Sequence, residues 1–216
     1  MKIAVASDLH LEFADINLQN NNNVDVLILS GDIMLAEDLH DAPVTVDPYM
    51  PGSLRDLNNK LARAQRFRDF LKRVSFQFPH VVYVAGNHEF YHGKWVKGIQ
   101  YLREECARYG NIHFLERDTV TIDDVLFVGG TLWTDLNKFD PLTLHAIRDM
   151  MNDYRIIRND AKGYTALKPA DTCERHRETR EYIKFIVDEN KDKKIVVVTH
   201  HSPSFQSCHP QYAHDT

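Results

Sequence analysis

Four groups of polar residues in this sequence each follow directly on a short apolar run, as side chains at the carboxyl ends of buried strands do. The groups are Asp8 with His10, Gly31 with Asp32, Gly86 to Glu89 (which includes Asn87 and His88), and His200 with His201. In α/β proteins the carboxyl ends of parallel strands meet at one edge of the sheet, where ligands bind. We therefore expect the four groups to form one site.

The residue types in these groups are those that bind divalent metal ions. Carboxylates, a carboxamide and imidazoles together suit Mn²⁺, Fe²⁺, Zn²⁺ or Co²⁺ better than an ion that prefers thiolates. Asp8 and His10 are two positions apart, so in an extended segment both side chains could bind the same ion. Asp32 could bridge two ions, and Asn87 could coordinate through its amide oxygen. This supply of ligands favours two ions over one.

His88 directly follows Asn87 and is the candidate for proton transfer. An imidazole beside bound cations could act as general acid and protonate a departing alkoxide. Each group alone also has an ordinary explanation, such as a turn Asp after a strand or a pair of His residues before Pro203. The occurrence of all four groups at strand ends favours the site.

The apolar periodicity of the chain predicts the elements that would position these residues. Parallel strands are expected over Lys2–Ser7, Val24–Ser30, His80–Ala85 and Lys194–Thr199, and a more antiparallel sheet over Ile112–Leu115, Thr119–Ile122 and Val125–Gly130. Helices are expected from Ser53, as a possible N-cap, to about Phe76, then over Trp95–Tyr109, Pro141–Met151 and Thr172–Asn190. Residues 152–171 are expected to be irregular. Alternating strands and helices indicate an α/β fold.

Length and composition narrow the class of protein. A chain of 216 residues with 43% hydrophobic residues predicts one domain over residues 1–216. With a net charge of -5, the chain as a whole has no positive field that would attract long nucleic acids, although the sequence does not exclude a local basic patch. No apolar stretch approaches the roughly 18 residues of a membrane span, and MKIAVASDLH is not a signal peptide. Cys106, Cys173 and Cys208 are widely spaced without a CxxC pair, which favours the reducing cytoplasm.

Five motifs, SDLHLEF, LILSGD, VAGNHEFY, GTLW and VVVTHHSP, resemble in this order the calcineurin-like metallophosphoesterases of the single-domain bacterial and phage type. The resemblance extends over nearly the whole chain and implies a four-layer α/β/β/α sandwich with two central mixed β-sheets. It implies that Asp8 and His10 bind a first metal ion, that Asp32 bridges, that Asn87 and His200 bind a second, and that His88 is the catalytic histidine. The expected cofactors are two divalent ions, Mn²⁺ before Fe²⁺, Zn²⁺, Ni²⁺, Co²⁺ or Mg²⁺.

The activity implied by this resemblance is hydrolysis of a phosphomonoester or phosphodiester by a hydroxide that two ions activate and direct at phosphorus. The expected partner is a small phosphorylated substrate, and His201, Tyr91 and Trp133 are candidates to contact it. An alternative is a metal-poor, catalytically silent relative that binds a ligand or partner protein. A third possibility is a DNA nuclease, but the sequence has no basic stripe and no appended capping domain for a duplex.

The sequence departs from the family pattern in two places. Leu35 occupies the position of a second acid that orients the catalytic histidine, with Glu37 and Asp38 beyond it, so the partner of His88 stays open. A Gly-His-x-His element that would supply one further ligand to each metal ion is not reached before Thr216, which suggests a chain truncated at its C-terminus. His209 and His214 could be substitute ligands or part of a loop at the substrate entrance. Cys208 is interpreted as an ordinary loop thiol, so no covalent phosphoenzyme is expected.

Overall fold

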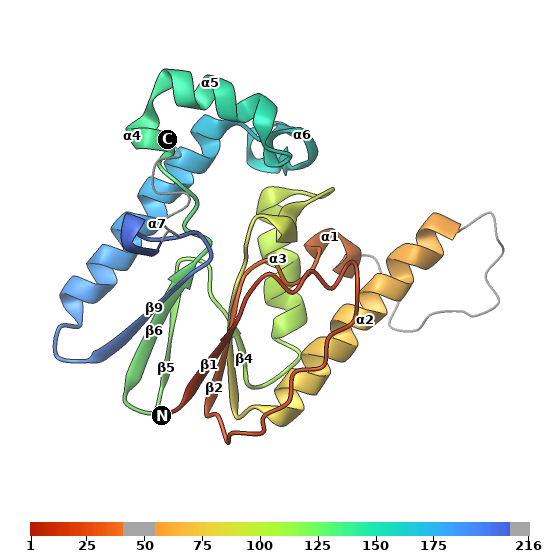
Figure 1. Cartoon of the computed structure of the whole chain (residues 1–216), viewed down its shortest axis with the longest axis vertical. Helices are drawn as coiled ribbons and strands as arrows, with labels where there is room; N and C mark the ends of the chain where they lie inside the picture. Colours follow the sequence, from red (N-terminus) through yellow and green to blue (C-terminus); the bar gives the residue numbers. More distant parts are fainter. Residues whose placement is uncertain (41–54, 208–216) are drawn as a thin grey trace.

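The computed structural model describes residues 1–40 and 55–207, in which two β-sheets lie face to face (Figure 1). The first sheet has the strand order β1 (Ile3–Ala6), β2 (Val26–Ser30), β3 (His80–Val84) and β4 (Ile112–Phe114), and all neighbours are parallel. The second has the order β5 (Asp118–Ile122), β6 (Val125–Gly130) and β9 (Lys194–Thr199), with β5 antiparallel and β9 parallel to β6. The predicted α/β class is confirmed. The placement of Ile112–Leu115 in the more antiparallel sheet is wrong, because β4 pairs in parallel with β3 in the first sheet.

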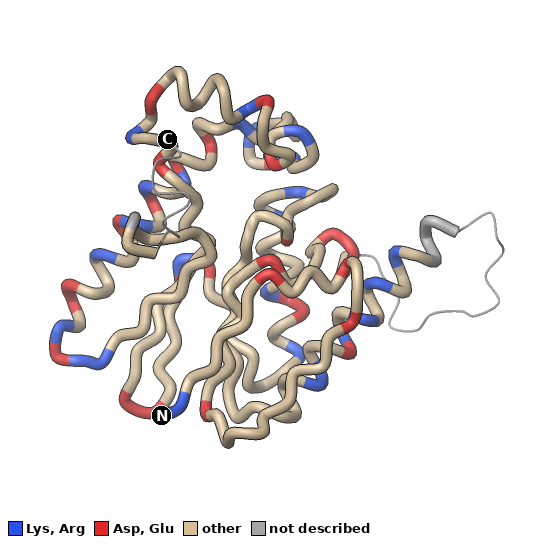
Figure 2. The backbone as a smooth tube through the Cα atoms, in the orientation of Figure 1, with Lys and Arg blue, Asp and Glu red and all other residues tan. Residues whose placement is uncertain are grey.

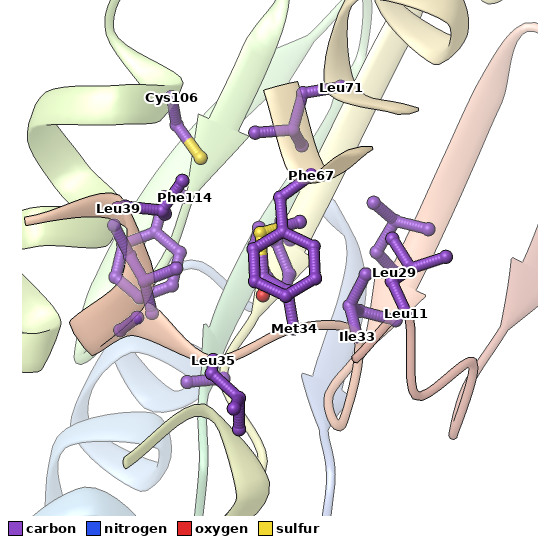
Figure 3. Close-up of a cluster of buried hydrophobic side chains, with 14 of the residues drawn as sticks. Leu11, Leu29, Ile33, Met34, Leu35, Leu39, Phe67, Leu71, Cys106 and Phe114 are labelled. Atoms are coloured by element: carbon purple, nitrogen blue, oxygen red, sulfur yellow. The ribbon is translucent and has the colours of Figure 1, made fainter. Parts of the chain in front are cut away.

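The outer face of the parallel sheet is covered by α2 (Arg55–Gln77) and α3 (Trp95–Cys106) (Figure 1). Figure 3 shows Phe67 and Leu71 of α2 in one cluster with Leu29 of β2 and Phe114 of β4. These side chains are buried because the apolar positions of α2 recur at helical spacing and so form one stripe along the helix. The N-cap predicted at Ser53 lies outside the described residues.

The inner face of the parallel sheet packs against the second sheet. Val26 and Ile28 of β2 belong to this inner cluster together with Phe127 of β6 and Val198 of β9. Leu27 and Leu29, which alternate with them, belong to the cluster beneath the helices. Since both faces of β2 are covered, its sequence is apolar at consecutive positions rather than at alternate ones.

The second sheet is flanked by α7 (Pro169–Glu189), and α4 (Leu136–Phe139), α5 (Pro141–Met150) and α6 (Asp153–Ile156) lie at the end of the molecule where the loops gather (Figure 1). The helix expected from Thr172 begins three residues earlier, because Pro169 suits a first helical turn and the Asp171 carboxylate accepts the N–H of Lys168 at 3.0 Å.

The prediction that residues 152–171 are irregular is partly wrong. This segment contains α6 and a two-stranded ladder of β7 (Arg158–Asn159) with β8 (Thr165–Ala166), joined through a 3-10 turn. Strands of two residues are too short to leave an alternating pattern in the sequence. The short helix α1 (Ala36–Leu39) is also absent from the predicted elements, because four residues are too few to show a helical period. Among the described residues, no helix is both long enough and apolar enough to cross a membrane.

Candidate metal centre

The loop that leaves β1 runs beside the loop that leaves β2. The N–H of Asp8 donates to the Gly31 carbonyl at 3.0 Å, and the N–H of His10 donates to the Asp32 carbonyl at 3.0 Å. These bonds continue the pairing of the two strands beyond their ends and bring Asp8 and His10 next to Asp32. The extended conformation expected for the first loop is wrong, because Asp8 and His10 have φ values of 55° and 46°. Because of this left-handed backbone, the two side chains point in different directions, and each belongs to a different group of potential metal ligands.

The first group consists of Asp8, Asp32 and His200, each of which offers one ligand atom within 4.8 Å of the others. Nδ1 of His200 donates to the Ser30 carbonyl at 2.8 Å, and Nε2 lies 3.5 Å from Oδ1 of Asp32. A histidine held through Nδ1 presents the Nε2 lone pair to a metal ion, and a backbone carbonyl is a usual partner for the other nitrogen. The donor set and its orientation therefore fit a divalent ion.

Two glycines allow the loops of this group to approach one another. Gly31 has a φ of 85°, and a Cβ added there would lie 2.5 Å from Nδ1 of His200 and 2.7 Å from the backbone nitrogen of Gly86. A Cβ added to Gly86 would collide with Oδ1 of Asp32. Only glycine fits either position without moving a proposed ligand.

The carboxylate of Glu89 connects the loops after β2 and β3. The side chain is fully buried in the short 3-10 helix η2 (His88–Phe90). It accepts hydrogen bonds from the backbone N–H groups of Asp32 at 2.9 Å, Ile33 at 2.7 Å and Gly86 at 2.7 Å, and from the hydroxyl of Tyr83 at 2.7 Å. Burial and the nearby charge of Asp32 raise the pKa of Glu89. These backbone hydrogen bonds to one carboxylate fix the position of Asp32 relative to Gly86.

The second group consists of His10, Glu12 and His88, whose ligand atoms also lie within 4.8 Å of one another. Oε1 of Glu12 accepts from Nδ1 of His10 at 3.2 Å and from Nδ1 of His88 at 3.3 Å. Burial opposes ionisation of Glu12, but the hydrogen bonds to the two rings outweigh it and lower its pKa. Burial alone would lower the pKa of His88, but the hydrogen bond to Glu12 and the negative charge of Asp32 outweigh this effect, so the pKa of His88 is raised. Glu12 thus supplies the partner of His88 that the sequence left open.

The acids that the sequence offered as alternatives for this role lie elsewhere. Glu37 lies 3.8 Å from Nζ of Lys94, and Asp38 forms an ion pair with Arg63 at 2.5 Å. Leu35 packs in the core beneath the helices. His209, His214 and Cys208 lie outside the described residues.

Asn87 and Tyr91 extend the site towards α6. Nδ2 of Asn87 donates to the Tyr91 hydroxyl at 3.4 Å, which in turn donates to Oδ2 of Asp153 at 3.2 Å. The Tyr91 ring stacks on His88 with centroids 4.0 Å apart, and burial next to Asp153 raises its pKa. The amide oxygen of Asn87 remains the atom available for a metal ion, and Tyr91 lies beside the catalytic candidate.

His201 and Trp133 form a wall next to His200. Nδ1 of His201 donates to the Thr131 carbonyl at 3.1 Å, and burial together with His200 lowers the pKa of His201 to about 4, so its ring is neutral at pH 7. The ring stacks on Trp133 with centroids 5.4 Å apart. Trp133 is only 3% exposed, and it packs in the core while contributing to this wall.

Comparison with known proteins adds a family and a fold. The model of the calcineurin-like phosphoesterase family matches residues 1–216. The chain is 27% identical over 205 residues to the uncharacterised protein L509 of Acanthamoeba polyphaga mimivirus, a match that covers 92% of this chain and 67% of that protein. Among solved structures, it is similar to the phosphopantetheinyl hydrolase PptH from Mycobacterium tuberculosis. The TM-score is 0.61 at 18% identity, over 96% of this chain and 70% of that one. This second likeness concerns the fold alone.

Proposed function

The chain belongs to the calcineurin-like phosphoesterase family, and from that membership we propose that it hydrolyses a small phosphomonoester or phosphodiester with two divalent metal ions. The family carries out metal-dependent hydrolysis of phosphoester bonds in general. The proposal adds the number of ions, their ligands and the residue that transfers a proton. The observation that carries it is the convergence of Asp8, Asp32 and His200 within 4.8 Å, next to the backbone of His88.

The residues that would hold the ions come from all four strand-end loops. Asp8 and His10 would bind one ion, Asn87 and His200 the other, and Asp32 would bridge them. His10 lies in the group of Glu12 and His88, with its ring 4.5 Å from that of His88, so it would reach the first ion from the side of the proton donor. Bound ions would supply Lewis-acid activation of a water molecule and charge compensation for the phosphoryl group. We propose Mn²⁺ as the preferred ion because three of the five proposed ligands, Asp8, Asp32 and Asn87, bind through oxygen, which suits Mn²⁺.

Asp32 is held in place for a bridging role from two sides. Its Oδ1 accepts the backbone N–H of His88 at 2.9 Å, and its own N–H is bound by Glu89. The residue is 5% exposed, so its carboxylate is largely removed from competing water. A buried carboxylate with a fixed orientation binds cations without first having to reorganise.

His88 is proposed to give a proton to the leaving oxygen from Nε2. Its Nδ1 hydrogen bond to Glu12 leaves Nε2 as the free ring nitrogen, and stacking on Tyr91 fixes the plane of the ring. The same carboxylate also holds His10, so the orientation of the proton donor is tied to that of a proposed metal ligand. Such shared partners set the geometry on which proton transfer depends.

We further propose that the protein works in the cytoplasm. Cys106 and Cys173 are buried and free, and they are not paired with each other. Burial raises the pKa of both thiols, to about 11 for Cys173, so neither is a reactive thiolate at neutral pH. Unpaired thiols of this kind are typical of a reducing compartment.

The proposal can be tested with metal-depleted protein assayed on bis-p-nitrophenyl phosphate and p-nitrophenyl phosphate. Mn²⁺, Ni²⁺, Co²⁺ and Mg²⁺ would be added singly, and bound metal would be measured by elemental analysis. We expect turnover that depends on added metal, with two ions bound per chain. Absence of turnover with every ion, together with less than about one bound ion per chain, would refute the proposal and favour a silent binding protein.

A further inference from the structure

Asp153, in the first turn of α6, is a buried carboxylate beside the metal centre that belongs to neither group of potential ligands. The residue is 2% exposed, and burial raises its pKa against the effect of the hydrogen bonds that it accepts. Burying a carboxylate costs free energy unless other groups compensate its charge. The explanation for Asp153 must therefore come from the groups that it contacts.

The basic residues near Asp153 in the chain have other partners. Figure 2 shows acidic and basic positions mixed around α6. Arg148 pairs with Asp149 at 3.2 Å, and Arg155 donates to the Asp149 carbonyl. No lysine or arginine that the structure describes forms an ion pair with Asp153. Its Oδ2 instead accepts the hydroxyl of Tyr91 at 3.2 Å, so the carboxylate is used for a hydrogen bond within the site.

The hydrogen bonds that connect Asn87, Tyr91 and Asp153 can run in only one direction. Burial and the charge of Asp153 raise the pKa of Tyr91, so its hydroxyl keeps its hydrogen at neutral pH. An ionised carboxylate can only accept, so the hydroxyl donates to Asp153 and accepts from Nδ2 of Asn87 at 3.4 Å. The NH2 group of Asn87 is thereby bound to Tyr91, and the amide oxygen is left to bind an ion.

The ring of Tyr91 also sets the plane of the His88 ring. The two rings stack with centroids 4.0 Å apart at an interplanar angle of 26°. Because the Tyr91 hydroxyl is bound at Asp153, the tyrosine ring cannot turn away from His88 without breaking that hydrogen bond. One tyrosine therefore contacts both a proposed metal ligand, Asn87, and the proposed proton donor.

The chain around Asp153 is anchored by its neighbours. The hydroxyl of Tyr154 is hydrogen-bonded to Oγ1 of Thr172 on α7 at 3.2 Å, and both side chains are buried. The N–H of Arg158, just beyond α6, donates to the Gly93 carbonyl at 3.0 Å. These contacts hold α6 against α7 and against the loop that follows η2, so the carboxylate of Asp153 has a fixed position relative to that loop.

From these contacts we propose that Asp153 is a positioning residue for the phosphoesterase reaction and that it acts through Tyr91. It turns the Asn87 amide so that the amide oxygen binds the ion shared with His200. It also keeps the His88 ring in the plane from which Nε2 protonates the leaving oxygen. The inference rests on the proposed function, and it goes beyond that function by assigning control of the site to α6, which supplies no proposed metal ligand.

Two variants interrupt these hydrogen bonds at different points. Asp153→Ala removes the acceptor, whereas Tyr91→Phe removes one oxygen atom and keeps the ring on His88, so it tests the inference even if Asp153→Ala does not fold. Mn²⁺ affinity would be measured by calorimetric titration of metal-depleted protein. We expect the affinity for one of the two ions to fall by about tenfold in both variants, while the other ion binds as in the wild-type protein.

The kcat values at saturating Mn²⁺ report on the orientation of His88. Phenolate is a more basic leaving group than p-nitrophenolate, so hydrolysis of phenyl phosphate depends more on proton donation than that of p-nitrophenyl phosphate. In both variants kcat should fall more for phenyl phosphate, whereas a general loss of folded protein would lower both rates by the same factor. The double variant should lose no more than the more affected single variant, because both changes interrupt the same hydrogen bond.

Asp160→Ala is the matched control. Asp160 accepts the backbone N–H groups of Val96 and Lys97 at 2.8 and 3.1 Å, so this change loosens the same part of the chain without altering the contacts of Tyr91. It should retain both Mn²⁺ affinities and the ratio of the two rates. Wild-type affinities and rates in Tyr91→Phe, additive losses in the double variant, or an equal loss in Asp160→Ala would each overturn the inference while leaving the phosphoesterase activity intact. If the wild-type protein hydrolyses neither these esters nor bis-p-nitrophenyl phosphate with any of the four ions, the proposed function fails and the inference fails with it.

Discussion

Oε2 of Glu89 accepts the backbone N–H of Asp32 at 2.9 Å, although the two residues are 57 positions apart in the chain. The same oxygen accepts the N–H of Gly86 at 2.7 Å. One buried carboxylate therefore holds together the two loops that carry Asp32, the proposed bridging ligand, and His88, the proposed catalytic histidine. The position of the proposed metal ligands depends on a residue that would not itself touch a metal ion.

We expect Glu89→Gln to destabilise the protein and to weaken metal binding. In the wild-type protein both oxygens of Glu89 accept backbone N–H groups. In glutamine one of these oxygens is replaced by an NH2 group, which cannot accept and would face backbone N–H groups that are themselves donors. A buried donor left without a partner costs about 1–3 kcal/mol. The free energy of unfolding from urea titration and the Mn²⁺ affinity should both fall. Glu104→Gln is the control, because Glu104 is exposed on α3. Equal behaviour of the two variants would show that the Glu89 network does not organise the site.

Glu12 is predicted to control the orientation of His88. Glu12→Ala removes the acceptor of both Nδ1 atoms, so kcat should fall by roughly 10- to 100-fold, and Glu12→Gln should lose less because its amide oxygen can still accept. Steady-state kinetics with saturating Mn²⁺ would measure this. The nearby Asp15→Asn, which changes an exposed ion pair with Arg73, should leave kcat unaltered. If Glu12→Ala retains wild-type kcat, His88 does not depend on Glu12.

Gly86→Ala should damage the metal centre, because the added methyl group would collide with Asp32. Overpacking of this kind costs about 1–3 kcal/mol and would displace the proposed bridging carboxylate. Thermal unfolding and bound metal per chain measure the two effects. Gly110→Ala is the matched control, since a Cβ at that exposed glycine meets no atom within 4 Å. A Gly86→Ala variant with wild-type metal content would contradict the proposed position of Asp32.

The lowered pKa of His113 leads to a prediction of how the free energy of unfolding depends on pH. Burial and the nearby His80 lower the pKa of His113 in the folded protein, so between that value and about 6.5 the unfolded chain binds more protons. Stability should therefore decrease as the pH falls below about 6.5. His113→Phe keeps a ring next to His80 and should reduce this decrease, as measured by urea midpoints at several pH values. The control His145→Gln, on the exposed face of α5, should leave this decrease unchanged. If His113→Phe loses stability with falling pH as steeply as the wild-type protein, His113 is not the group responsible.

Much of the fold could be predicted because its strands are covered on both faces. A run such as VLILS at Val26–Ser30 has few alternatives to a central parallel strand, and the long apolar stripe of α2 has few alternatives to a helix. The elements that the sequence did not reveal are short. The ladder of β7 with β8 depends on contacts made after folding, such as the N–H of Leu167 donating to the Ile157 carbonyl at 3.0 Å, and such contacts leave no periodic signal.

The convergence of the metal-binding candidates could be predicted because each one follows a strand. The roles of Glu12 and Glu89 could not, although both residues lie within the motifs. An acid next to a ligand in the sequence could equally be a ligand, a hydrogen-bond partner or a surface charge. Glu89 is fully buried and Glu12 lies between two rings, and these are properties of the folded chain. The left-handed backbone at Asp8 and His10, which separates them into two groups, is likewise not specified by the residue types, although Asp and His adopt this conformation more often than most residues.

The most direct test of the central claim is metal content measured together with turnover of bis-p-nitrophenyl phosphate, in the wild-type protein and in Asp32→Asn. Asparagine has nearly the same shape as aspartate but lacks the negative charge needed to bridge two cations. The account predicts two ions per wild-type chain and Mn²⁺-dependent turnover. In Asp32→Asn it predicts at most about one bound ion and a loss of turnover of at least about a hundredfold. Wild-type turnover in the metal-depleted protein, or in Asp32→Asn, would contradict it.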